Sequence, residues 1–258
     1  GEIRFIMLNY LPLMTFNTDL EPVPGAAESF ELSEDGQTFT FNLRPDMTYS
    51  DGEPLTAENF EYAWKRLCDP DVAGDYTSIA FPVVGCEEYY TAYDSGEVTV
   101  TDEAELQTLR DGVGVEAVDE NTLTIQLKEP APYFLNVAAL WVGAPVREDL
   151  VEAGGETWWF DPVNYIGNGP FQAEEEFVPG EGITLTRYED YAGENKAKAD
   201  AVEYRVYAEV DTAYTDAQDG NLDIVDVIPP DTIATAPDEF GDRFIRTQSS
   251  QITYLGFP

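Results

Sequence analysis

The sequence predicts a mixed α/β fold in which helices flank small sheets. Short runs of alternating apolar and polar residues, separated by Asp-Gly or proline turns, predict strands with one buried face. Between these runs, apolar residues recur at helical spacing, and the interleaving of the two periods is typical of α/β proteins. With 258 residues, 43% of them hydrophobic, the chain can bury one large core or two ordinary ones.

Residues 30–43 predict a β-hairpin. Apolar and polar residues alternate on both sides of the Asp35-Gly36 turn, which indicates two paired strands that share one buried face. The alternating apolar positions are Phe30, Leu32, Phe39, Phe41 and Leu43.

A helix is predicted next, from Thr56 to the residue before the Asp69-Pro70 break. Thr56 stands at the N-cap position, and Glu58 lies in the first turn, where an acidic side chain is favoured. Four apolar residues then share one helical face, namely Phe60, Ala63, Trp64 and Leu67.

The middle of the chain predicts a second helix and a second hairpin. The helix covers residues 103–110, and the hairpin pairs strands at 115–118 and 123–127 across the turn at 119–121. The apolar run at 133–140 indicates a buried helix, or a helix followed by a strand.

The remainder predicts three strands, a helix and a last short strand. An aromatic cluster at 158–160 and a glycine-punctuated loop at 164–170 precede them. The strands are expected at 171–177, 183–188 and 202–206, the helix at 211–218 and the last strand at 222–228.

Charge excludes nucleic acid as a partner. Asp and Glu number 51 against 13 Lys and Arg, so the net charge is −38 and phosphate backbones are repelled. Two interpretations of this acidity stay open: a solvated surface, as in a salty habitat, or an acidic cleft for cationic ligands.

The chain has no histidine, which removes Ser-His and Cys-His nucleophiles and the commonest transition-metal ligand. We therefore expect no cofactor and no metal site. The two cysteines, Cys68 and Cys86, cannot form a zinc site alone. They form either a disulfide, which would indicate an oxidising compartment, or two buried free thiols.

Five segments, in order, resemble family 5 of the bacterial extracellular solute-binding proteins. The most specific is FTFNLRPDMTYSDGEPLTAENFEYAWKR at 39–66, with a strand ending in Leu-Arg, an Asp-Gly turn and a Pro-Leu-Thr-Ala-Glu helix start. The other four are VPGAAESFELSEDG (23–36), NTLTIQLKEPAPYF (121–134), IGNGPFQAEEEFVPGEGITLTRYEDYAG (166–193) and GNLDIVDVIPP (220–230).

The resemblance implies a periplasmic-binding-protein-like fold of type II (cluster C). It implies a small family-specific domain at 11–146, with 1–10 and 147–258 forming part of the first ligand-binding lobe. Members of the family are about twice this length and continue into a second lobe, so we expect a truncated chain that lacks that lobe and binds solute weakly by itself.

The implied function is that of the solute-binding component of an ABC importer, with no enzymatic activity. Such a protein captures peptides or related small solutes outside the membrane, closes over them at a hinge and delivers them to the permease subunits. We expect an extracellular or periplasmic monomer, anchored to the membrane as a lipoprotein. The longest apolar run, at 137–146, is too short to span a bilayer.

Carry-over from the family gives five candidate ligand-binding residues. Tyr76 matches a cleft tyrosine of oligopeptide-binding relatives, and Trp141 lies near a position that faces the cleft. Asn168 and Gly169 are expected to offer backbone amides to a ligand, and Tyr254 lies where the chain passes between lobes. For each of the first four, a purely structural role in packing or turn formation stays open.

The alternative function is that of a carbohydrate-active enzyme or a sugar-binding surface protein. Trp158 and Trp159 could stack on sugar rings, and the carboxylates of residues 174–176 could act on a glycosidic bond. Core packing of the two tryptophans and a solvated strand edge are the simpler interpretations.

Overall fold

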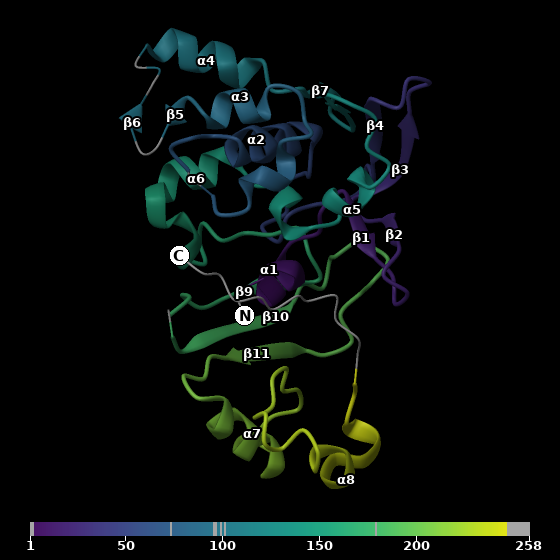
Figure 1. Cartoon of the computed structure of the whole chain (residues 1–258), viewed down its shortest axis with the longest axis vertical. Coiled ribbons are helices and arrows are strands. Elements are labelled where there is room, and N and C mark those ends of the chain that lie inside the picture. The colour runs from purple at the N-terminus through teal and green to yellow at the C-terminus, as the bar shows by residue number, and fades with distance from the viewer. Residues whose placement is uncertain are drawn as a thin grey trace, which may run out of the picture. The chain divides into compact units, whose positions relative to one another are not determined.

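The computed structural model describes residues 3–72, 74–94, 97–98, 100, 102–178 and 180–246. The chain divides into two compact units, of which the first ends at Arg205 and the second begins at Val206 (Figure 1). The first unit contains two hydrophobic cores, each formed by one small sheet and the helices packed on it.

The first core lies on a four-stranded antiparallel sheet of order β3-β4-β8-β7. Its strands are β3 (Ala27–Leu32), β4 (Thr38–Leu43), β8 (Thr122–Gln126) and β7 (Val115–Asp119). Phe41 lies opposite Leu123 and Phe39 opposite Ile125, so the apolar residues of both central strands share one face. Both predicted hairpins are confirmed as strand pairs. The buried face expected for the first strand is wrong, because Phe30 is 36% and Leu32 48% exposed at the edge of the sheet.

Helix α2 (Ala57–Leu67) covers this sheet, as predicted. Thr56 is the N-cap residue, and its backbone N–H donates to the Asn59 side chain at 2.9 Å. The Trp64 ring is fully buried and packs on Phe134 of α5 (Phe134–Val137), with the ring centroids 5.7 Å apart.

Short elements accompany the first core along the same part of the chain. They are β1 (Met14–Phe16), β2 (Pro22–Pro24), the 3₁₀ helix η1 (Thr77–Ala80), α3 (Cys86–Tyr90), β5 (Tyr93–Asp94), β6 (Glu97–Val98) and α4 (Glu103–Asp111). The predicted helix α4 begins after Asp102, whose carboxylate accepts from the backbone N–H groups of Ala104 and Glu105.

The second core lies on a three-stranded antiparallel sheet of order β11-β10-β9. Its strands are β9 (Phe171–Ala173), β10 (Gly182–Arg187) and β11 (Ala201–Arg205), and all three were predicted. Packed with them are α1 (Ile3–Asn9), the 3₁₀ helix η2 (Trp141–Gly143), α6 (Glu148–Gly154) and η3 (Gly155–Phe160). The Phe5 ring of α1 lies 5.3 Å from that of Phe177.

The second unit contains α7 (Val210–Gln218), as predicted, together with α8 (Ala236–Phe240) and η4 (Gly241–Arg243). The strand expected at 222–228 is wrong, because these residues form turns and irregular backbone. Asp223 and Asp226 interrupt the apolar run, and Ile224 is 80% exposed, so no apolar face exists to be buried against a partner strand.

None of the helices in the described part of the chain combines the length and the apolar character that a membrane span requires.

Candidate functional site

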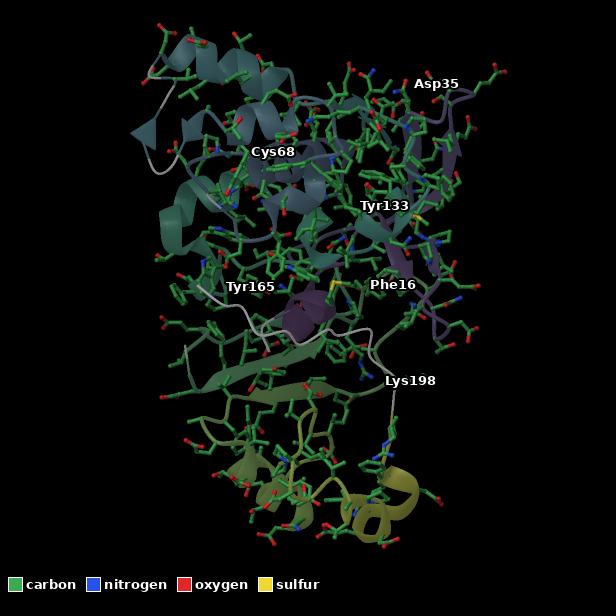
Figure 2. All side chains as sticks on the ribbon, in the orientation of Figure 1. Phe16, Asp35, Cys68, Tyr133, Tyr165 and Lys198 are labelled. Atoms are coloured by element: carbon green, nitrogen blue, oxygen red, sulfur yellow. A yellow bond between two sulfur atoms is a disulfide. The ribbon has the colours of Figure 1, made fainter. Side chains whose placement is uncertain are left out.

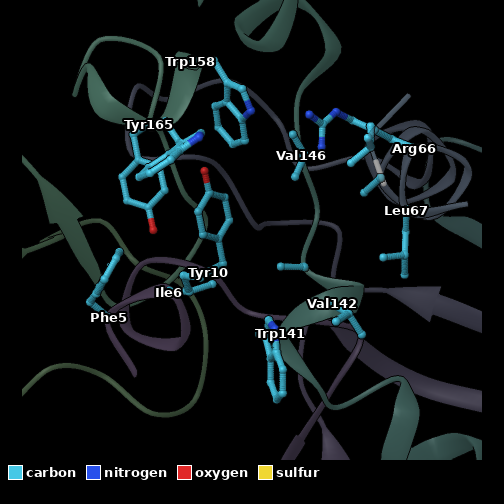
Figure 3. A pocket seen from close by; sticks show the side chains of 14 residues that line it. Phe5, Ile6, Tyr10, Arg66, Leu67, Trp141, Val142, Val146, Trp158 and Tyr165 are labelled. Carbon is cyan, nitrogen blue, oxygen red and sulfur yellow. The ribbon is translucent and has the colours of Figure 1, made fainter. Parts of the chain in front are cut away.

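A cavity of about 330 Å³ lies in the first unit, between α1, α2 and the segments that begin at Trp141 and Trp158 (Figure 3). Its lining is mostly aromatic and aliphatic. The large rings at or near its wall are Phe5, Tyr10, Trp141, Trp158, Trp159 and Tyr165. An apolar cavity of this size with few polar groups is typical of a site for a small ligand.

Helix α2 serves both the core and the cavity. Phe60 and Trp64 pack into the first core, whereas Ala63, Arg66 and Leu67 line the cavity. Residues three and four apart lie on one side of a helix, so the cavity receives a continuous stripe of α2. Arg66 is the one charged side chain among the described residues that line it.

Tyr76 and Trp141, which the family resemblance singled out, lie against each other. Their rings meet edge to face, with the centroids 5.3 Å apart and the planes at 83°. Tyr76 is 49% exposed and precedes η1, and Trp141 begins η2 and also lines the cavity. The pair therefore forms an exposed aromatic wall that continues into the cavity.

The loop that carries Tyr76 is fastened to the end of α2. The Thr77 hydroxyl donates to the Leu67 carbonyl at 3.0 Å. Next to it, Cys68 and Cys86 form a disulfide with an S–S distance of 2.03 Å, and both residues are fully buried (Figure 2). The disulfide joins the end of α2 to the start of α3 and closes the loop that contains Tyr76.

Two buried tyrosines line the cavity. The Tyr10 and Tyr165 rings meet edge to face at 5.4 Å, and Figure 3 shows the Tyr10 hydroxyl pointing towards Trp158. Burial raises the pKa of the Tyr10 hydroxyl well above its ordinary value, and the neighbouring Tyr165 adds to this effect. Burial also raises the pKa of Tyr165. Both groups are therefore neutral near pH 7 and can donate a hydrogen bond.

Asn168 and Gly169 hold the segment that leads from α1 to β1. The Asn168 side chain accepts from the Leu11 backbone N–H and donates to the Leu11 carbonyl, both at 3.0 Å, and the Gly169 N–H donates to the Asn9 carbonyl at 2.8 Å. A Cβ atom on Gly167 would lie 1.9 Å from the Asn9 oxygen, so only glycine allows this approach.

These contacts give Asn168 and Gly169 a structural role, because the Gly169 N–H is taken by Asn9 and both residues are buried. A part in ligand binding stays a prediction for them. Tyr254 lies outside the described residues.

The tryptophans on which the carbohydrate alternative depends are less exposed than Tyr76. Trp158 is only 8% exposed, and Trp159 packs on Phe160 with the ring centroids 3.9 Å apart. Directly after β9, the Glu174 carboxylate accepts from the Thr186 hydroxyl at 2.9 Å. Within the described residues, no group of three or more carboxylate or cysteine side chains is placed to hold a metal ion.

Arg66, Tyr10 and the cavity itself were not predicted from the sequence. The one signal for Arg66 was its helical spacing from Ala63, which places both on the same side of α2. Nothing in the order of residues indicates that α1 brings Tyr10 to the same place.

A family model and curated relatives identify the family of this chain. Residues 21–258 match the family model described as "Bacterial extracellular solute-binding proteins, family 5 Middle". The dipeptide-binding protein DppE of Bacillus subtilis is 32% identical over 211 residues, and the periplasmic oligopeptide-binding protein OppA of Escherichia coli is 32% identical over 214. In both cases the alignment covers 82% of this chain and 36% of the relative.

Solved structures of two peptide-binding proteins have a fold similar to that of this chain. The unliganded open form of the murein tripeptide binding protein MppA matches with a TM-score of 0.80 at 28% identity. Haemophilus influenzae OppA in complex with the peptide RPPGFSPFR matches with a TM-score of 0.80 at 26% identity. Each match covers 93% of this chain and 44% of the other. The expected type II fold is confirmed, and the chain spans about a third of the length of the curated relatives it matches.

Proposed function

Because the chain belongs to family 5 of the bacterial extracellular solute-binding proteins, we propose that it captures peptides for an ABC importer. It binds peptides or related small solutes outside the membrane and delivers them to the permease subunits. The observation that carries this proposal is the exposed Tyr76–Trp141 wall, which continues into an apolar cavity in a chain whose relatives bind dipeptides and oligopeptides.

The ligand lies along this wall, with its apolar side chains towards the cavity. Aromatic rings at a protein surface offer large contact areas at a low entropic cost, since only two torsions are fixed. Binding involves no bond making or breaking, so the protein is not an enzyme.

The two hydrophobic cores support the proposed division into a small domain at 11–146 and a part of the first lobe at 1–10 and 147–258. The first core is drawn mainly from residues between Leu13 and Ala139, with Tyr188 and Tyr191 added. The second core is drawn from Phe5 and Tyr10, from Ala144 and from residues between Trp158 and Leu185. Each core belongs almost entirely to one of the two proposed parts.

The protein works outside the membrane, as a monomer that is anchored as a lipoprotein. The Cys68–Cys86 disulfide supports an oxidising location, because cytosolic thiols are kept reduced. Labelling of a lipid-modified cysteine in the native host, together with fractionation of its membranes, tests the anchoring. Sedimentation equilibrium tests the monomer.

A thermal-shift screen tests the proposed function. It compares peptides of two to nine residues with oligosaccharides of similar size, each at concentrations up to the millimolar range. We expect peptides to raise the melting temperature, because a ligand that binds only the folded chain stabilises it. Stabilisation by oligosaccharides alone, or turnover of a glycan that one carboxylate substitution abolishes, would support the carbohydrate alternative instead.

A further inference from the structure

Arg66 differs from the other half-buried basic residues that the structure describes. Each of the others has a carboxylate oxygen within ion-pair distance, whereas Arg66 has none. The paired residues are Arg44, Lys65, Arg110, Lys128, Arg147 and Arg187.

Among the described residues, the absence of an acidic partner for this half-buried arginine is unexpected. The chain has 51 acidic residues against 13 basic ones, so carboxylates are abundant. Its neighbour in sequence, Lys65, pairs with Glu61 at 2.6 Å one turn earlier on α2. Arg66 lines the cavity, and in Figure 3 its guanidinium group points towards the neighbouring Val146, which also lines it.

The groups around Arg66 define what the cavity can accept. Part of the cavity lining is apolar and favours an aromatic or branched aliphatic group of a ligand. It is formed by the rings of Tyr10, Trp141 and Trp158. The guanidinium group has five N–H donors in a planar fork that matches a carboxylate. Elsewhere in the lining, the Tyr10 hydroxyl is a neutral donor, because burial raises its pKa.

We propose that this cavity binds the carboxylate-bearing apolar end of a ligand, with the carboxylate on Arg66 and the apolar group among Tyr10, Trp141 and Trp158. The inference rests on the proposed function in one respect: the ligand is then a peptide whose C-terminal residue is aromatic or aliphatic and supplies both groups. Arg66 and the cavity together select the free carboxyl end and a large last side chain.

The net charge of the chain does not prevent an anion from binding here. At physiological ionic strength charges are screened beyond about 8 Å, so the acidic surface acts weakly on a bound carboxylate. A guanidinium group in direct contact acts strongly, because few water molecules separate the two charges in a partly buried site.

The test uses the chain with ¹⁵N-labelled tryptophan and two small probes, 3-phenylpropionate and its neutral amide. Of the four indole N–H signals, those of Trp141, Trp158 and Trp159 report on the cavity, and that of the fully buried Trp64 is the internal control. At pH 7 we expect both probes to shift the cavity signals and the acid to bind about tenfold more tightly, as one charge-assisted contact allows.

Three variants assign the preference to Arg66. Arg66→Gln should abolish the preference for the acid and leave binding of the amide unchanged, and Arg66→Lys should retain part of it. Arg110→Gln removes a half-buried arginine that pairs with Glu148 outside the cavity, and should retain the full preference. Equal binding of acid and amide, a preference that survives in Arg66→Gln, or no shift of any cavity signal would overturn the inference.

Tripeptides separate this inference from the proposed function. Ala-Ala-Phe should bind more tightly than its C-terminal amide, and only when Arg66 is present. Peptides that bind equally well as acid and amide would overturn the inference and leave the proposed function intact. Small probes that bind as expected while no peptide binds would contradict the proposed function alone.

Discussion

Trp141 packs edge to face on Tyr76, with 5.3 Å between the ring centroids, although 64 positions separate the two residues in the chain. The contact joins the loop after α2 to the segment after α5. It turns two single aromatic residues into one wall beside the cavity, and its strength can be measured.

A double-mutant cycle measures the coupling between these rings. Tyr76→Ala, Trp141→Ala and the double variant are compared by urea unfolding. We expect a coupling energy of about 0.5–1.5 kcal/mol, the range found for aromatic pairs. Tyr76→Phe keeps the ring and should keep most of the coupling. Strictly additive effects of the two alanine substitutions would show that the rings do not interact in solution.

The disulfide closes the loop that carries Tyr76. Replacing Cys68 and Cys86 together by serine should lower the free energy of unfolding by about 3 kcal/mol, because the unfolded chain is no longer constrained by an 18-residue separation. Thiol titration of the unreduced, denatured protein should find no free thiol. Two free thiols, with unchanged stability of the serine variant, would contradict the disulfide.

Asn168 fastens the start of the chain to the loop after η3. Asn168→Ala leaves the Leu11 N–H and carbonyl without their partners, so we expect a loss of about 2–4 kcal/mol in urea unfolding. Asn136→Ala is the matched control, since Asn136 is exposed and its side chain donates one hydrogen bond, to the Tyr133 carbonyl. A similar small loss in both variants would argue against the structural role of Asn168.

The buried tyrosines predict alkaline destabilisation. Burial raises the pKa of Tyr10 and Tyr165, so the unfolded chain loses these protons first as the pH rises. The stability from the neutral hydroxyls is fully present below pH about 10 and is lost as the pH rises towards the pKa values of the folded state, at up to about 1.4 kcal/mol per pH unit for each group.

Urea unfolding between pH 8 and pH 11 checks this dependence. In Tyr10→Phe, the free energy of unfolding should fall less steeply above pH 10, by up to about 1.4 kcal/mol per pH unit. Tyr133→Phe changes an exposed tyrosine and is the matched control. An identical slope in Tyr10→Phe and in the unmodified chain would exclude a contribution from Tyr10.

Local periodicity was sufficient to predict the two hairpins of the four-stranded sheet and the helices α2 and α4, but not the shorter elements around them. Phe39 and Phe41 alternate with polar residues, and the strand of Leu123 and Ile125 repeats the pattern, so both hairpins could be predicted without knowing their partners. Helix α1 was missed, because it has no acidic residue in its first turn and no basic one in its last.

Contacts between distant segments could not be predicted in this way. The cavity needs α1, α2 and the segment after α6 to meet, and no local pattern specifies that meeting. The same limit explains the wrong strand at 222–228, since a short apolar run becomes a strand only where a neighbouring strand pairs with it. The family resemblance predicted Tyr76 and Trp141 as two separate ligand-binding residues. The structure adds that their rings are in contact.

Native mass spectrometry of the chain with short peptides tests the central claim, peptide capture, most directly, and it applies equally to any longer polypeptide that contains the chain. We expect one peptide bound per chain, with binding weakened in Trp141→Ala and retained in the control variant Tyr133→Phe. If no peptide of two to nine residues binds, at concentrations up to the millimolar range, to the chain or to a longer polypeptide that contains it, peptide capture is contradicted.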